Sequence, residues 1–158
     1  MKQSYIGYKH KQMGPGKILP NGVKIFSFGP LDATYEDTKH FISEVIHGNV
    51  RMLWLESRTE KDSSGDMVLE VKDVLVFPNL NEEKQTLFYL TEHCTRNGKS
   101  NVRLVALADK GLRHYRYKGQ RRWKAINTIR QAWRANTRAE KFEPISTRAI
   151  QCEEPDLP

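Results

Sequence analysis

Two long stretches in the middle of the chain have the residue pattern of β-strands, and this pattern restricts the fold more than any other feature. Met67–Phe77 places Leu69 and Val71 on one parity, and Val50–Arg58 has a similar apolar centre. Alternation with a period of two is typical of β-strands, whose successive side chains point to opposite faces. The polar segment Asp62–Asp66 has the composition of a turn. We therefore expect the two stretches to pair as antiparallel strands.

Two Asn-Gly pairs predict further hairpins, because Asn-Gly readily adopts the positive φ angles of a tight turn. Pro20-Asn21-Gly22 separates the apolar segments 17–19 and 23–28. Asn97-Gly98 lies between the segments Thr86–Leu90 and Asn101–Ala108. Together with the central pair, the second hairpin predicts a meander of four strands.

Thr34–His47 has the clearest helical pattern. Thr34 and Asp37 have the spacing of a capping box, and Gly48 follows as a stop signal. One face of this helix would be formed by Phe41, Ile42, Val45 and Ile46. We predict a helix that covers one face of the meander.

Leu112–Ala139 has two conflicting patterns. Arg113–Lys118 alternates as a strand does, whereas Ile126, Ile129 and Trp133 have helical spacing. We predict a strand followed by a helix over residues 120–136.

These elements predict an α+β fold, in which an antiparallel sheet formed as a meander of hairpins packs with one or two helices. The final strand is expected at the sheet edge over Lys141–Cys152, where Pro144 removes a backbone donor. The expected core residues are Phe41, Ile42, Val45, Leu53, Leu55, Leu69, Val71, Leu75, Leu104, Ala106 and Trp133.

The size of the chain fits one ordinary domain. It has 158 residues, of which 38% are hydrophobic and 28% charged. We expect a single domain over 1–158, with a basic N-terminal arm or irregular first strand over 1–16 and a flexible tail over 153–158. No apolar run reaches the roughly 18 residues of a membrane span, and the N-terminal residues lack the apolar segment of a signal peptide. The expected location is the cytoplasm.

The net charge of +7 is unevenly distributed along the chain. Residues 25–95 have a balance of −7, whereas Arg96–Lys141 has 14 Lys or Arg against two acids, a balance of +12. Within this region the segment 112–138 interleaves cations with aromatic rings. Its candidate nucleic-acid-binding residues are Arg113, Tyr115, Arg116, Tyr117, Lys118, Arg121, Arg122, Trp123, Lys124, Arg130 and Arg134.

Cations neutralise phosphates, and aromatic faces can stack on unpaired bases. The segment 112–138 therefore predicts a small non-enzymatic module that binds nucleic acid or another polyanion. The alternative is a protein-interaction or regulatory subunit whose basic face docks on an acidic protein. A further alternative is that the basic and acidic segments pair with each other, within one copy or between copies in a homo-oligomer.

Other kinds of site have little support in the sequence. The five histidines lack the spacing of a metal site, and no catalytic residue or cofactor is predicted. The acidic residues of the segment 25–95 are explained by a solvated surface. Cys94 fits a small buried apolar position, and Cys94 with Cys152 would be the one possible intrachain disulfide in an exported protein.

Several motifs resemble a set of small conserved cyanobacterial proteins of unknown function. The motifs are Val74-Leu75-Val76-Phe77-Pro78, Asn97-Gly98-Lys99, Ala132-Trp133-Arg134-Ala135-Asn136, Lys141-Phe142-Glu143-Pro144-Ile145-Ser146-Thr147 and Cys152. The resemblance covers about residues 50–152 and implies no activity. It implies two strands, Trp133–Asn136 and Phe142–Ile145, around a turn at Thr137–Glu140, as an alternative to the second helix. Members of this set often have an export leader, whereas this chain begins with a basic arm.

Overall fold

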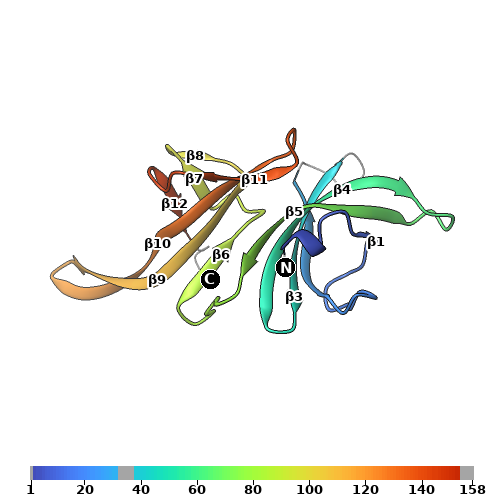
Figure 1. The fold of residues 1–158 in the computed structure, drawn as a ribbon. Coiled ribbons are helices and arrows are strands. Elements are labelled where there is room, and N and C mark those ends of the chain that lie inside the picture. The colour runs from blue at the N-terminus through green and yellow to red at the C-terminus, as the bar shows by residue number, and fades with distance from the viewer. Residues whose placement is uncertain (1, 32–37, 154–158) are drawn as a thin grey trace. The chain divides into compact units, whose positions relative to one another are not determined.

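The computed structural model describes residues 2–31 and 38–153, and nearly all of its regular structure is β (Figure 1). A short 3₁₀ turn, η1 (Lys2–Ser4), precedes the strands. The strands are β1 (Lys9–Lys11), β2 (Lys24–Pro30), β3 (His40–His47), β4 (Val50–Lys61), β5 (Met67–Phe77), β6 (Gln85–Phe88), β7 (Cys94–Arg96), β8 (Lys99–Ser100), β9 (Leu104–Tyr117), β10 (Gln120–Asn136), β11 (Lys141–Ile145) and β12 (Ile150–Cys152). The α+β prediction is wrong, because the described residues contain no α-helix.

The chain divides into two compact units. The first unit contains Met1–Leu80 and Ala135–Glu143, and the second contains Asn81–Arg134 and Pro144–Pro158. No helix among the described residues is long and apolar enough to span a membrane.

The first unit contains a five-stranded antiparallel sheet in the order β1-β5-β4-β3-β2. The predicted central pair is confirmed, since β4 pairs with β5 and Leu53 lies opposite Leu75. The predicted turn after Leu19 is also present, because Gly22 N donates to Leu19 O and Ile18 bridges to Lys24. The strands β2 to β5 follow one another in this sheet, and β1 extends it at the β5 edge.

The predicted helix over Thr34–His47 is wrong over its last eight residues, which form β3; residues 34–37 lie outside the described part. Both faces of β3 are buried from His40 to Val45, so the strand has no polar and apolar alternation. Its polar residues have partners inside the protein: Ser43 donates to Glu56, and His40 contacts Glu140. These polar positions had the spacing of a solvated helix face, but in the structure they belong to a buried sheet.

The predicted helix over Gln120–Asn136 is also wrong, because these residues form the long strand β10. β10 pairs antiparallel with β9 in a four-stranded sheet of order β11-β10-β9-β6. The strands implied by the resemblance, around a turn at 137–140, are present as the end of β10 and β11. Asn136 Oδ1 holds this turn by accepting from the backbone N–H groups of Arg138 and Ala139. Side chains of a strand alternate between two faces, so Ile126 and Ile129 lie on opposite faces of β10 although their spacing would place them on one face of a helix. Their helical spacing was therefore misleading.

The Asn97-Gly98 turn joins β7 and β8, rather than the two longer strands that flank it in the sequence. β6 does pair with β9, with Thr86 opposite Ala108, but a longer connection that contains β7 and β8 links them. The predicted meander is therefore wrong, because β4 with β5 and β6 with β9 belong to different sheets. The predicted last strand is two strands, since β11 and β12 lie at the edges of separate sheets.

The core prediction is largely confirmed. Nine of the eleven expected residues are buried, whereas Leu75 and Trp133 are only partly buried. Trp54, which was not expected in the core, is the largest fully buried side chain and contacts the rings of Tyr5 and Tyr8.

Candidate nucleic-acid interface

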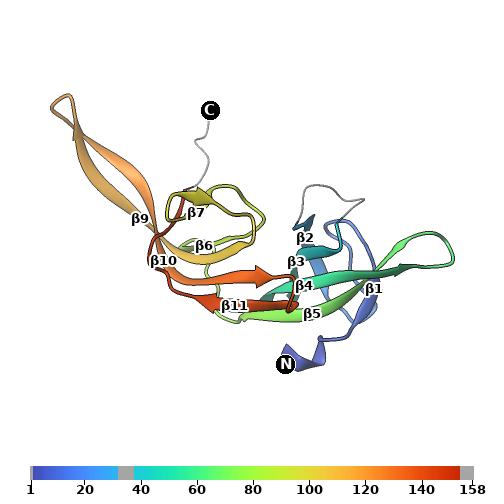
Figure 2. The same cartoon turned by 90° about the horizontal axis from the view of Figure 1, so that it is seen from above.

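β9 and β10 continue past the rest of their sheet as a two-stranded ribbon, which we define as residues 110–124 (Figures 1 and 2). The third strand, β6, pairs with β9 only from Ala106 to Asp109. Every described side chain of the ribbon is exposed, including Leu112 at 67% and Trp123 at 64%. An isolated two-stranded hairpin is at best marginally stable in water. Burial in this protein therefore does not explain why the ribbon is so long.

Lys118 and Gly119 form the two-residue turn at the tip of the ribbon. Their φ angles are +52° and +77°, and positive φ at both central positions is the pattern of a type I′ hairpin turn. This turn fixes the register, so that Tyr117 lies opposite Gln120 and Arg116 opposite Arg121. The Lys-Gly pair with strand alternation on both sides was the sequence signal that could have revealed the hairpin.

The register divides the ribbon side chains between two faces, because opposed residues of an antiparallel pair share a face and neighbours along a strand alternate. We call the two sets the tyrosine face and the tryptophan face. The tyrosine face has Arg113, Tyr115, Tyr117, Arg122 and Lys124. The tryptophan face has Lys110, Leu112, His114, Arg116, Arg121 and Trp123. Each face thus has three cations and at least one large exposed ring.

Each face also has two cations directly opposite one another across the strands. Arg116 lies opposite Arg121 on the tryptophan face, and Arg113 lies opposite Lys124 on the tyrosine face. Like charges in directly opposed positions destabilise an antiparallel pair. No acidic side chain in the part of the chain that the structure describes forms an ion pair with any of these four cations. The ribbon therefore has two sites of uncompensated positive charge.

Three rings of the ribbon, those of His114, Trp123 and Tyr117, contact neighbouring side chains. His114 and Trp123 are opposite each other, and their ring centroids are 5.0 Å apart. Arg122 and Lys118 place their charged groups 5.5 Å and 5.4 Å from the centre of the Tyr117 ring. Such cation–π contacts orient the cations.

Nine of the eleven predicted site residues lie in the ribbon, and two do not. Arg130 Nη1 is 3.6 Å from Asp109 Oδ1 at the base of the ribbon, where Ile129 and Gln131 flank a shift in register. Arg134 lies farther along β10, opposite Leu104. Lys110, Leu112 and His114 were not among the predicted site residues, and the alternation of β9 adds them to the tryptophan face.

Four acidic residues of the segment 25–95 contact N-terminal lysines in the first unit, namely Asp62, Asp66, Glu70 and Asp73. Lys2 Nζ is 3.2 Å from Asp73 Oδ1, and Lys11 Nζ is 2.9 Å from Asp62 Oδ2. Lysine and acidic side chains thus partly neutralise each other within this unit, whereas the ribbon sequence has seven Lys or Arg and no acid. Among the described residues, no group of three or more His, Cys, Asp or Glu side chains is arranged to hold a metal ion.

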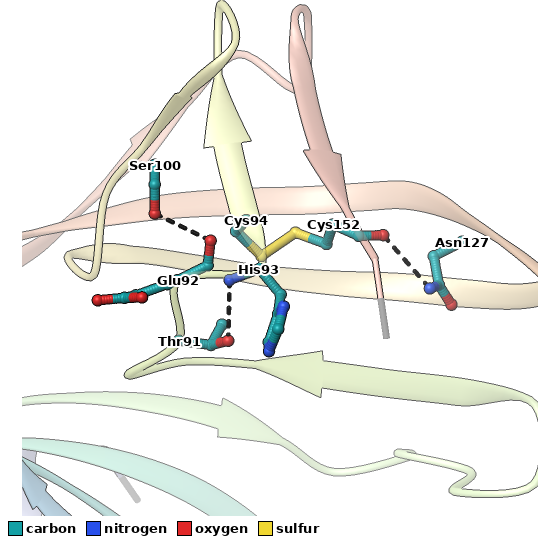
Figure 3. The surroundings of a disulfide bond; sticks show 7 residues. All are labelled: Thr91, Glu92, His93, Cys94, Ser100, Asn127 and Cys152. Carbon is teal, nitrogen blue, oxygen red and sulfur yellow. Dashed lines mark hydrogen bonds between the residues drawn. A yellow bond between two sulfur atoms is a disulfide. The ribbon is translucent and has the colours of Figure 1, made fainter. Parts of the chain in front are cut away.

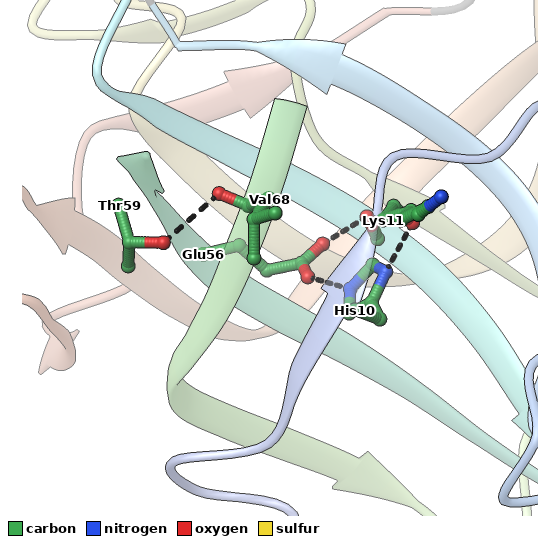
Figure 4. A network of polar contacts seen from close by, with 6 residues as sticks. His10, Lys11, Glu56, Thr59 and Val68 are labelled. Carbon is green, nitrogen blue, oxygen red and sulfur yellow. Dashed lines mark hydrogen bonds and ion pairs between the residues drawn. The ribbon is translucent and has the colours of Figure 1, made fainter. Parts of the chain in front are cut away.

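A buried polar network in the first unit contains residue types that could suggest catalysis (Figure 4). His10 Nε2 and Ser43 Oγ both donate to the carboxylate of Glu56, and His10 Nδ1 donates to Lys11 O at 2.8 Å. Burial lowers the pKa of His10, but the hydrogen bond and the charge of Glu56 outweigh it and raise that pKa above its ordinary value. His10 and Ser43 each contact Glu56, and all three are buried. This network therefore joins β1 to β3 and β4 through buried hydrogen bonds.

Cys94 and Cys152 form a disulfide between β7 and β12 (Figure 3). Their Cα atoms are 4.1 Å apart, and Glu153 N donates to His93 O beside them. This places the cysteines at a non-hydrogen-bonded pair, where opposed side chains are closest. Both belong to a cluster with Leu104, Ala106 and Ala132 at the base of the ribbon strands. Asn127 also donates from Nδ2 to Cys152 O at 3.3 Å.

Comparisons with protein-family models, with curated proteins and with solved structures found no match to this chain.

Proposed function

We propose that this chain is a small non-enzymatic module that binds nucleic acid through the ribbon. The observation that carries the proposal is the pair of opposed cations on each face, Arg116 with Arg121 and Arg113 with Lys124. A phosphate that lies between two such cations would remove their repulsion, and its bound counterions would be released on contact. The exposed rings of the same faces could add contacts to bases or sugars.

Two further observations support the ribbon as the contact surface. Lys2 and Lys11 already have acidic partners in the first unit, so the ribbon holds the largest group of uncompensated cations in the described residues. Arginine, with its forked donors, is suited to phosphate oxygens and supplies four of the seven ribbon cations. Asp62 and Asp73 already have lysine partners, so they do not need the ribbon to balance their charge.

The test is salt-dependent binding of fluorescent oligonucleotides to the whole chain. If the seven ribbon cations all contact phosphates, the slope of log K against log salt should be about −6 on duplex DNA and about −5 on a single strand. We expect Arg116→Ala/Arg121→Ala to reduce the magnitude of that slope by about two.

The matched control is Arg138→Ala/Arg148→Ala, which removes two exposed guanidinium groups outside the ribbon. This variant has the same net charge as the ribbon variant and should bind nearly as the original chain does. Equal losses in both variants would mean that net charge alone drives binding. A chain that ignores every oligonucleotide but binds an acidic protein would replace the proposal with the protein-interaction alternative.

A further inference from the structure

We infer that the nucleic acid is a duplex, and that the ribbon inserts lengthwise into its major groove so that both faces contact it at once. This inference rests on the proposed function and adds the class of ligand. It follows from the equivalence of the two faces, each of which has an opposed cation pair and an exposed aromatic ring.

The dimensions of the ribbon fit such a groove. The ribbon spans eight residues of β9 from Lys110 to Tyr117, which corresponds to about 25 Å at the usual rise of a strand. The major groove of B-form DNA is about 12 Å wide and admits a two-stranded β-ribbon. No third strand pairs with β9 or β10 at the ribbon in the described residues, so no neighbouring strand obstructs its entry into a groove.

The distribution of charge favours a ligand that surrounds the ribbon over one that lies on a single side. A single strand stacked on Trp123 would meet Arg116 and Arg121 but would leave the repulsion between Arg113 and Lys124 uncompensated. A ligand on the tyrosine face would leave the other pair in the same state. Phosphates on the two walls of a groove that encloses the ribbon can reach cations on both faces, because Arg and Lys side chains are long and flexible.

The apolar content of the two faces supports the same conclusion. Trp123 and Leu112 are exposed on one face, and Tyr115 and Tyr117 on the other. A ribbon that binds on one side needs only polar residues on the side that faces solvent. Here the two faces can contact different parts of one enclosing ligand.

The experiment compares two charge-matched variants, one for each face. Arg116→Ala/Arg121→Ala removes the pair on the tryptophan face, and Arg113→Ala/Lys124→Ala removes the pair on the tyrosine face. Both variants and the Arg138→Ala/Arg148→Ala control are titrated with a duplex of about 20 base pairs, two helical turns, and with each of its separated strands. Because all six positions are exposed, each variant should keep the fold, which circular dichroism checks.

We expect both ribbon variants to bind the duplex more weakly by similar factors, roughly 10- to 100-fold near 0.1 M salt, and the control to be nearly unchanged. Methyl green, which occupies the major groove, should displace the chain from the duplex, whereas netropsin in the minor groove should not.

A loss confined to one ribbon variant, or tighter binding to a separated strand than to the duplex, would overturn the duplex inference and leave the proposed function in place. Displacement by netropsin alone would also overturn the major-groove assignment. If neither ribbon variant differed from the control on any oligonucleotide, the proposed function itself would be wrong.

Discussion

Arg116 and Arg121 lie directly opposite each other across the tip of the β9–β10 ribbon, two like charges in positions where an antiparallel pair is destabilised. Substituting Arg121→Glu would turn this repulsion into an attraction. We expect amide hydrogen exchange at the ribbon tip to slow by about two- to fivefold at low salt, while duplex binding falls. Unchanged or faster exchange would show that the opposed charges do not strain the ribbon. Arg138→Glu makes the same charge change outside the ribbon and serves as the control.

The turn at the ribbon tip depends on Gly119. Its φ of +77° is in the left-handed region, and a Cβ there would meet no atom within 4 Å, so Gly119→Ala tests conformation alone. We expect the substitution to destabilise the closed tip by about 1 kcal/mol, which would appear as faster exchange of the nearby amides. Gly14→Ala is the control, because Gly14 also has open space but no positive φ. Equal effects of the two substitutions would contradict the turn assignment.

The Cys94–Cys152 disulfide closes a long loop, since the two cysteines are 58 positions apart in the sequence. The chain-entropy model predicts that reduction lowers the free energy of unfolding by about 4 kcal/mol. Urea unfolding with and without a reductant measures this difference, and Cys94→Ser/Cys152→Ser should not respond to the reductant. A midpoint that reduction leaves unchanged would contradict a stabilising role. Titration of free thiols in the purified chain should find none.

His10 gives the stability of the first unit a pH dependence with a definite sign. Its pKa is raised in the folded chain, despite the opposing effect of burial, by its contacts with Glu56 and the Lys11 carbonyl. The stabilisation is therefore fully present below the ordinary value of 6.5 and is lost as the pH rises through the higher pKa of the folded state.

Urea unfolding from about pH 6 to about pH 9 should show this loss in the original chain and a smaller loss in His10→Gln. The substitution also removes one partner of the buried Glu56 carboxylate, so it should lower stability at every pH. The same pH slope in both proteins would assign the effect to another group.

The strands that alternate clearly were predictable from the sequence. Met67–Phe77 forms β5 and Val50–Arg58 lies within β4, and the turns at Gly22 and Gly98 have positive φ as their residue types require. The ribbon cations could also be identified, because charge needs no tertiary context to be counted. These features depend on residues that are close in sequence.

The two helix predictions were wrong for reasons that involve distant residues. β3 is buried on both faces, and Glu56 and Glu140 satisfy two of its polar side chains, Ser43 and His40, from 13 and 100 positions away. β10 remains extended because β9 pairs with it along its length. A local pattern of apolar residues cannot report such partners.

By itself, the sequence determined that this chain has alternating strands, tight Asn-Gly turns and a strongly basic segment with aromatic rings. Only the tertiary structure decided that Arg113 opposes Lys124, that Arg116 opposes Arg121, and that these pairs occupy opposite faces of one exposed ribbon. It likewise decided that Cys94 meets Cys152. The physical reason is that strand register sets which side chains share a face. In the ribbon, that register depends on the Lys118-Gly119 turn and on pairing along two whole strands.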